Sequence, residues 1–251
     1  MKIIDFDTHI AAKKENVAVT AEELLKIMDK AGIDQAVAWP MVTYTRQLSA
    51  DNRAVWEASK KYPDRIIPFG AVNPRLGTEE AMNELNLCID EYGFKGVKIN
   101  GGRDQYYIDD PVLTLPLISR IAEKKLVLAL HSGHKDPVFS HPFIVGKIAK
   151  MFPELTIVMV HMGGMQGLHD AAIQVCKECP NIYPAASECN PKAIVKAIKE
   201  LGPERVLFAS DVPFTLGYTD VAVFEAILKD FDSRTRELVM GGNAARILNL
   251  K

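Results

Sequence analysis

Eight short apolar runs recur along the chain at nearly regular intervals, and this repetition constrains the fold more than any other feature. The runs are residues 2–9, 35–40, 66–73, 94–100, 126–133, 155–163, 182–187 and 206–213. Some, such as residues 126–130, are apolar at every position, which is typical of parallel strands that are covered on both faces. Their starts lie 24 to 33 residues apart, which is enough for one helix and a right-handed crossover between neighbouring strands.

Segments with helical spacing lie between the apolar runs. Thr20 and Glu23 form a capping-box pattern ahead of one such segment, and Pro142 and Pro191 stand near the starts of two others. We therefore predict an α/β fold, a single (β/α)8 TIM barrel that occupies residues 1–251 as one domain. A doubly wound open sheet is the main alternative, but the turn after the first run, residues 8–11, lacks the glycine-rich dinucleotide pattern.

Composition excludes several classes of function. The 251 residues include 30 Lys plus Arg and 32 Asp plus Glu, so the net charge is −2, and no basic excess indicates a nucleic-acid partner. No stretch of 18 apolar residues predicts a membrane span, and no signal-peptide core follows the first residues. The four cysteines are too scattered for a disulfide framework. We expect a cytoplasmic protein.

Polar residues of metal-ligand and acid/base types follow the apolar runs, at the ends where a barrel of this kind forms its active site. Because side chains alternate along a strand, Asp7 and His9 point to the same side of the first run and can reach a single ion. His131 lies near the end of the fifth run, His161 near the end of the sixth and Asp211 near the end of the eighth.

Four of these residues form a candidate metal-ligand set. Asp7, His9, His131 and Asp211 supply two nitrogens and two carboxylates, which suits zinc, manganese or iron(II). A single buried His or Asp at a strand end often only satisfies backbone groups or caps a helix. Their joint placement at strand ends favours a metal site instead.

Five motifs in order along the chain resemble the amidohydrolase-related family of the amidohydrolase superfamily, which includes the aminocarboxymuconate semialdehyde decarboxylases. The motifs are residues 4–9, 131, 161–164, 207–213 and 242–248. The resemblance implies a (β/α)8 barrel with one divalent metal ion, with zinc expected first and manganese or iron(II) as alternatives. It also implies a homodimer or homotetramer.

The resemblance assigns roles residue by residue. His9, His131 and Asp211 match metal ligands, and His161 matches the histidine that lies near the water on the metal. Asp7 departs from the family pattern, because most of the superfamily has a histidine there. Relatives with Glu-x-His, such as the γ-resorcylate decarboxylases, indicate that a carboxylate is accepted at this position. Lys98 stands where binuclear members have a bridging lysine, and we interpret it as a substrate-facing or structural cation.

Residues at or just after the ends of the second, fourth and seventh runs are candidates for substrate contacts. Trp39 and Tyr44 offer aromatic walls, and Lys98 and Arg103 offer cations, which suits a small planar or carboxylate-bearing molecule. Glu188, directly after the seventh run, is a further candidate. Loop packing and surface charge stay open as the alternative interpretation of each.

Three functions fit these residues. The first is a metal-dependent hydrolase of a small lactone, amide or ester, in which Asp211 is the general base and His161 assists the developing oxyanion. The second is a non-oxidative decarboxylase of a small unsaturated or aromatic acid, which the Asp-x-His motif favours. The third is a non-catalytic barrel that lost its metal when the histidine was replaced by Asp7 and that serves as a binding or assembly module.

Overall fold

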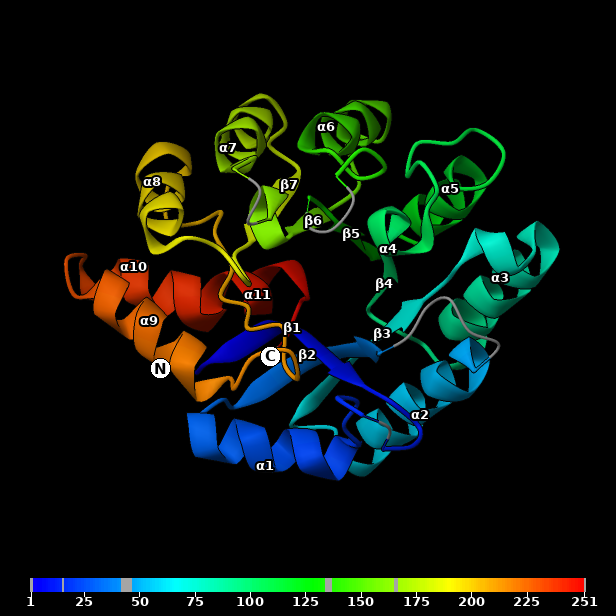
Figure 1. Ribbon diagram of the computed structural model, residues 1–251, viewed down its shortest axis with the longest axis horizontal. Coiled ribbons are helices and arrows are strands. Elements are labelled where there is room, and N and C mark those ends of the chain that lie inside the picture. The colour runs from blue at the N-terminus through cyan, green and yellow to red at the C-terminus, as the bar shows by residue number, and fades with distance from the viewer. Residues whose placement is uncertain (1, 15, 42–46, 134–136, 165–166, 251) are drawn as a thin grey trace.

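The computed structural model describes residues 2–14, 16–41, 47–133, 137–164 and 167–250. Within this part of the chain, seven parallel strands pair in sequence order from first to last. They are β1 (Ile4–Ile10), β2 (Gln35–Pro40), β3 (Ile66–Ala71), β4 (Gly96–Ile99), β5 (Val127–His131), β6 (Ile157–Val160) and β7 (Ile182–Ala185). The sheet curls on itself, with the helices around its outer side (Figure 1). Each of these strands falls on a predicted apolar run.

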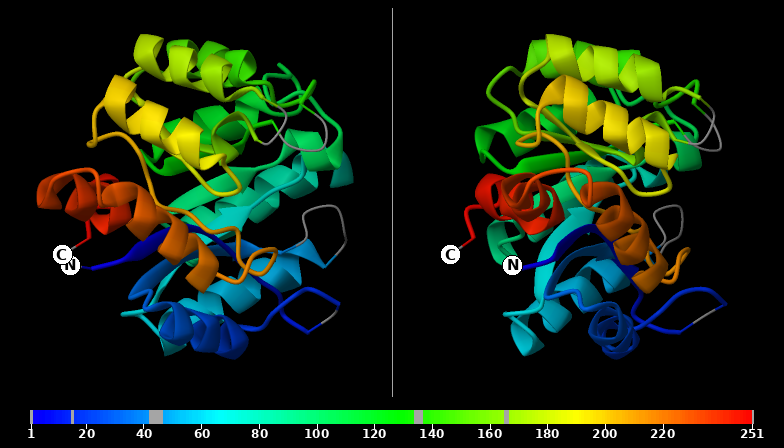
Figure 2. Two further views of the ribbon diagram at one scale, coloured as in Figure 1. Left: turned by 60° about the vertical axis from the view of Figure 1, so that its left-hand side comes forward. Right: turned by 90° about the vertical axis from the view of Figure 1, so that its left-hand side faces the viewer.

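Helices follow the strands as predicted and surround the sheet in the views of Figure 2. The longer ones are α1 (Ala21–Ala31), α2 (Leu48–Lys61), α3 (Thr78–Asn86), α5 (Leu115–Glu123), α6 (Pro142–Met151), α7 (His169–Glu178), α8 (Pro191–Leu201) and α9 (Tyr218–Leu228). The short ones are α4 (Gly101–Asp104), α10 (Ser233–Glu237) and α11 (Asn243–Ile247). None of the described helices is long and apolar enough to cross a membrane.

The helix starts behave as the sequence indicates. The side chain of Thr20 accepts a hydrogen bond from the backbone N–H of Glu23, and the Glu23 carboxylate accepts one from the backbone N–H of Thr20, which confirms the capping box of α1. Pro142 and Pro191 are the first residues of α6 and α8, where the missing N–H costs nothing.

The predicted eighth strand, residues 206–213, is not a regular strand in the structure. Isolated bridges connect this segment to its two neighbours, with Leu207 beside β7 and Val212 beside β1. The N–H of Leu207 donates to the carbonyl of Pro184 (2.9 Å), and the N–H of His9 donates to that of Val212 (2.8 Å). Asp211 has a φ of 68°, which breaks the extended conformation. The curled parallel α/β layout is therefore confirmed, whereas the count of eight strands is not.

Two apolar clusters cover the two faces of the sheet. The larger lies between the strands and the helices, and the smaller joins alternate residues of most strands, among them Phe6, Val37 and Phe69. The rings of Phe6 and Phe69 pack edge to face with centroids 5.7 Å apart. Strand β4 contributes no residue to the smaller cluster. Burial on both faces explains why the strands are almost continuously apolar.

A bulge in β1 determines which of its side chains reach the site. Between the pairs Asp5–Ala36 and Thr8–Ala38, β1 contains one residue more than β2. Such a bulge re-aims the side chains that follow it. Phe6 therefore belongs to the smaller apolar cluster, while Asp7 lies beside polar residues from the other strands.

Candidate functional site

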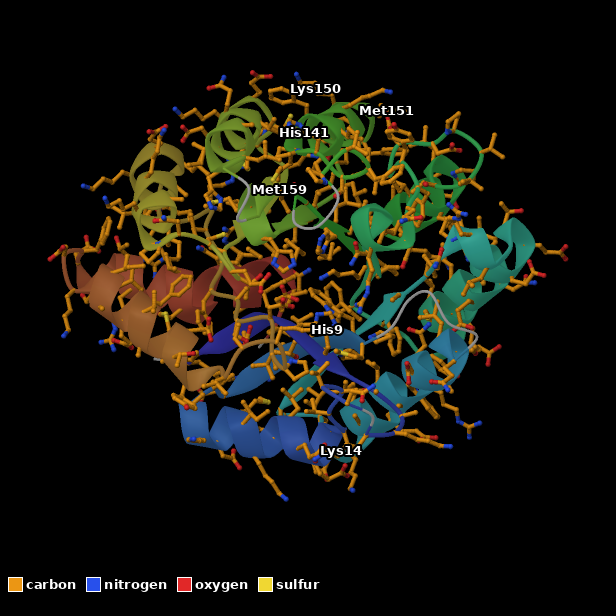
Figure 3. All side chains as sticks on the ribbon, in the orientation of Figure 1. His9, Lys14, His141, Lys150, Met151 and Met159 are labelled. Atoms are coloured by element: carbon orange, nitrogen blue, oxygen red, sulfur yellow. The ribbon has the colours of Figure 1, made fainter. Side chains whose placement is uncertain are left out.

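A cavity of about 310 Å³ opens where the carboxyl ends of the strands meet. It is lined by His9, Lys98, Asn100, Arg103, His131, His161, Glu188, Asp211 and Phe214. His9 lies near the centre of the molecule, inside the curl of the sheet (Figure 3). Most of the residues predicted at the strand ends therefore meet at this one place.

Asp7, His9 and Asp211 form a compact group whose ligand atoms all lie within 4.8 Å of one another. His9 Nε2 is 3.0 Å from Asp211 Oδ1 and 3.6 Å from Asp7 Oδ1. His9 Nδ1 lies 3.3 Å from the carbonyl oxygen of Pro40 and donates to it, so the lone pair of the neutral ring is at Nε2. Three buried electron-pair donors thus converge on one point.

The electrostatics of this group fit a bound cation. Burial and the neighbouring Asp7 carboxylate raise the pKa of Asp211 to about 8. Burial, followed by the charge of Lys98, lowers the pKa of His9 to about 3, so its imidazole is neutral at physiological pH, as a metal ligand must be. Two carboxylates and a neutral imidazole are suitable ligands for a divalent metal ion.

Lys98 lies beside the group formed by Asp7, His9 and Asp211. Its Nζ is 3.5 Å from Asp7 Oδ1 and 3.8 Å from the centroid of the Trp39 ring, and the side chain is almost completely buried. Burial alone would raise the pKa of Asp7, but the neighbouring Lys98 charge holds it below its ordinary value. Lys98 is therefore a buried cation paired with Asp7, and it also lines the cavity.

Trp39, predicted to contact substrate, lies behind His9 instead. Its side chain is fully buried and is not part of the cavity wall. The indole N–H donates a hydrogen bond to His9 Nε2 (3.2 Å). Trp39 therefore acts on the site through His9 and Lys98.

The remaining predicted residues take different places around the cavity. The guanidinium of Arg103 donates to the carbonyl of Met41 (3.0 Å) while lining the cavity. The ring of His131 packs edge to face on that of His161, with centroids 4.7 Å apart. His131 lines the cavity but is in neither of the two three-ligand groups found among the described residues. Tyr44 lies outside the described residues.

A second group joins His161, Glu188 and Asp211, again with ligand atoms within 4.8 Å of one another. All three residues have left-handed backbone conformations, with φ of 65°, 53° and 68°. Such conformations cost about 1–3 kcal/mol each in residues other than glycine and concentrate at functional sites. Three left-handed residues thus lie together at this end of the sheet, beside the cavity.

Sequence analysis missed two residues that organise the site, Asp5 and Ser187. The Asp5 carboxylate accepts hydrogen bonds from the N–H of Ser210 (2.9 Å) and of Asp7 (3.1 Å), and so fixes β1 against the segment that contains Asp211. Ser187 contacts both Asp7 and His161. The position of Asp5 two residues before Asp7 was a signal for its role, and Ser187 ends the seventh run directly before Glu188, but neither position reveals the contacts made.

Gly133, two residues after the end of β5, permits a test of how closely the segments around the cavity are packed. Its φ is 69°, and a Cβ there would overlap the backbone of Gly163. Gly32 has a φ of 72° but no atom within 4 Å of such a Cβ. We expect Gly32→Ala to lower the free energy of unfolding by about 1–2 kcal/mol, the left-handed cost alone, and Gly133→Ala by at least about 2 kcal/mol more.

Urea denaturation of the two variants measures this difference. Gly32→Ala is the matched control, because it introduces the same methyl group at nearly the same φ without the overlap. Equal unfolding midpoints for the two variants would show that the loops after β5 and β6 are not held in close contact.

Comparison with known proteins adds the following. A family model described as amidohydrolase matches residues 4–250. The chain is 25% identical over 236 residues to a 2-amino-3-carboxymuconate-6-semialdehyde decarboxylase from Dictyostelium discoideum, covering 79% of this chain and 65% of that protein. It is 23% identical over 251 residues to a γ-resorcylate decarboxylase from a Rhizobium species, covering 76% of each. The chain thus spans somewhat less than two thirds of the first relative.

Solved structures share the fold. An uncharacterised TIM-barrel protein from Bordetella bronchiseptica superposes with a TM-score of 0.82 at 21% identity, covering 99% of both chains. A dihydroxybenzoic acid decarboxylase from a Polaromonas species, solved with manganese and 2-nitroresorcinol, superposes with a TM-score of 0.75 at 20% identity. The superposition covers 99% of this chain and 97% of that one.

Proposed function

The chain belongs to the amidohydrolase family, and we propose that it acts as a metal-dependent, non-oxidative decarboxylase of a small aromatic or unsaturated carboxylic acid. The observation that carries this proposal is the buried group of Asp7, His9 and Asp211 beneath a small cavity that also contains cations. The names of both relatives reported above support decarboxylation. Hydrolysis, our first expectation, has no support beyond the family itself, so it becomes the alternative.

The proposed cofactor is one divalent metal ion. Asp7, His9 and Asp211 would hold it, with His131 as the fourth ligand that the family resemblance assigns. When bound, the ion neutralises the substrate carboxylate and polarises a neighbouring hydroxyl oxygen. Manganese, present in the Polaromonas structure, takes precedence over the zinc that we expected from the sequence.

The cavity suits a small anionic substrate. Its volume of about 310 Å³ is at the lower end of the range for ligand pockets and fits a single substituted ring. Lys98 and Arg103 favour a carboxylate, and Phe214, whose ring lies 5.6 Å from that of His9, provides an apolar wall. The proposed partner is therefore a small-molecule acid. A homodimer or homotetramer stays a prediction from the family resemblance.

The reaction needs one proton transfer that the chain can supply. When the bond to the carboxyl group breaks, carbon dioxide leaves and the electron pair stays on the ring carbon, which then takes a proton. In the metal-free chain, burial raises the pKa of Asp211 to about 8, so among the three candidate ligands this carboxyl group most readily takes up a proton. Asp211 Oδ1 lies 3.0 Å from His9 Nε2 and belongs to the candidate ligand group, so we assign the proton transfer to the carbon to Oδ2. His161 is placed to accept a hydrogen bond from a substrate hydroxyl.

A substrate panel in heavy water tests the proposal. The manganese-loaded protein is incubated with 2,6-dihydroxybenzoate, 5-carboxyvanillate and a set of lactones, and both carbon dioxide and products are measured. We expect carbon dioxide from at least one acid, with one deuterium at the carbon that carried the carboxyl group. Opening of a lactone without carbon dioxide from any acid would favour the hydrolase.

A further inference from the structure

Ser187 lies between a candidate metal ligand and the histidine of β6. Its Oγ is 2.6 Å from Asp7 Oδ2 and 2.9 Å from His161 Nδ1, and the side chain is completely buried. No step of the proposed reaction uses this hydroxyl. The two contacts nevertheless join the two groups of ligand atoms described above.

The direction of these hydrogen bonds follows from the number of protons. Ser187 has one hydroxyl proton, and Asp7, an ionised carboxylate beside the Lys98 ammonium, can only accept. The hydroxyl proton therefore points to Asp7 Oδ2. The Ser187 oxygen must then accept from His161, which places the proton of the neutral imidazole on Nδ1 and its lone pair on Nε2.

Neighbouring contacts restrict the His161 ring further. Its edge-to-face contact with the His131 ring limits its rotation, and the thiol of Cys189 donates to the His161 carbonyl (3.1 Å), which holds the backbone that carries the ring. Nδ1 contacts Ser187, and Nε2 is on the other edge of the ring; His161 lines the cavity together with Asp211 and Glu188.

We propose that Ser187 is a positioning residue that fixes His161 as the Nδ1–H tautomer and directs the Nε2 lone pair into the cavity. The tautomer is a property of the folded chain alone, whereas its kinetic effect rests on the proposed decarboxylase function. Without the hydroxyl, Nδ1 loses its acceptor and Asp7 loses a donor, so both tautomers of His161 become accessible.

The direct test is ¹⁵N-histidine NMR on metal-free protein at a pH where the ring is neutral, with the His161 signal assigned from a His161→Gln variant. We expect the Nδ1–H tautomer in the wild type and in Ser187→Thr, which retains a hydroxyl. We expect a mixture of tautomers in Ser187→Ala. Ser140→Ala is the matched control, because Ser140 is equally buried and its hydroxyl has no hydrogen-bond partner among the described residues.

Kinetics provide the second readout. On the metal-loaded enzyme, Ser187→Ala should lower kcat by about 10–100-fold, the usual range for residues that orient a ligand or base, with KM within about twofold. Ser187→Thr should recover most of kcat. If Ser187→Ala does not fold, Ser187→Cys, close to serine in size and a weak acceptor, takes its place with the same expectation.

An Nε2–H tautomer in the wild type, or an unchanged Nδ1–H tautomer in Ser187→Ala, would overturn the inference. The two proposals fail separately. If the tautomer behaves as expected but no acid is decarboxylated, the proposed function fails and the role of Ser187 in fixing His161 stands.

Discussion

Asp211→Asn is expected to lower kcat for decarboxylation by at least about 1,000-fold, because the substitution removes both the proposed proton donor and one charge of the ligand group. Asn has nearly the same shape, so the fold and the cavity should persist. Carbon dioxide release at saturating substrate measures the loss, and metal content measured on the same samples separates a chemical effect from loss of the ion.

The matched control is Asp170→Asn. Asp170 is an exposed carboxylate in α7 that pairs with Lys196 at 2.7 Å. It has no part in the proposed reaction. Exposed ion pairs of this kind contribute little, so the control should retain wild-type activity. If Asp211→Asn retains activity within tenfold of the wild type, Asp211 is not the proton donor.

Asp7→Ala is expected to have the largest effect on stability. Asp7 is fully buried, and its removal leaves the Lys98 ammonium buried without its carboxylate partner. Breaking a buried pair in this way costs about 3–5 kcal/mol. Urea denaturation of chelator-treated protein measures this loss without a contribution from metal, and the same variant should bind no divalent ion when metal is restored.

The double variant Asp7→Ala/Lys98→Met identifies the cause. Once the stranded ammonium is replaced by an apolar side chain of similar length, most of the lost stability should return, while metal binding stays absent. If the double variant is no more stable than Asp7→Ala, the buried charge of Lys98 is not what destabilises the single variant.

Much of the fold could be predicted from the sequence, because burial on both faces gives parallel strands a continuous apolar signature. The eighth segment departed from the prediction since its apolar run contains Asp211, whose left-handed conformation interrupts the strand. A run of apolar letters does not reveal a backbone angle. The assignment to one domain and the cytoplasmic location stay predictions.

The site was predictable where its residues lie at strand ends, and it was not where long-range contacts decide. Asp7 and His9 belong to one group, as their alternate spacing indicated, although the bulge of β1 between Asp5 and Thr8 includes Asp7. Ser187 contacts Asp7 across 180 residues of sequence, and no local pattern encodes that pairing. Trp39 was assigned to substrate because aromatic residues often line pockets, but its indole N–H instead donates to His9.

The reaction type could not be decided from the first group of ligands, since the same residues serve water attack on a lactone and loss of carbon dioxide from an acid. The Asp-x-His motif pointed weakly toward decarboxylation and did not exclude hydrolysis. The names of the relatives now favour decarboxylation, and the small cavity with Lys98 and Arg103 at its wall is consistent with an acid substrate.

The proposed decarboxylation depends on one divalent ion held by the group around His9. Titration of chelator-treated protein with manganese tests this dependence, when bound metal and the rate of carbon dioxide release are followed together. We expect the rate to rise from zero in proportion to bound metal and to stop rising at one ion per chain. Release of carbon dioxide at full rate by the metal-free protein would contradict it, as would one bound ion with no release from any acid of the panel.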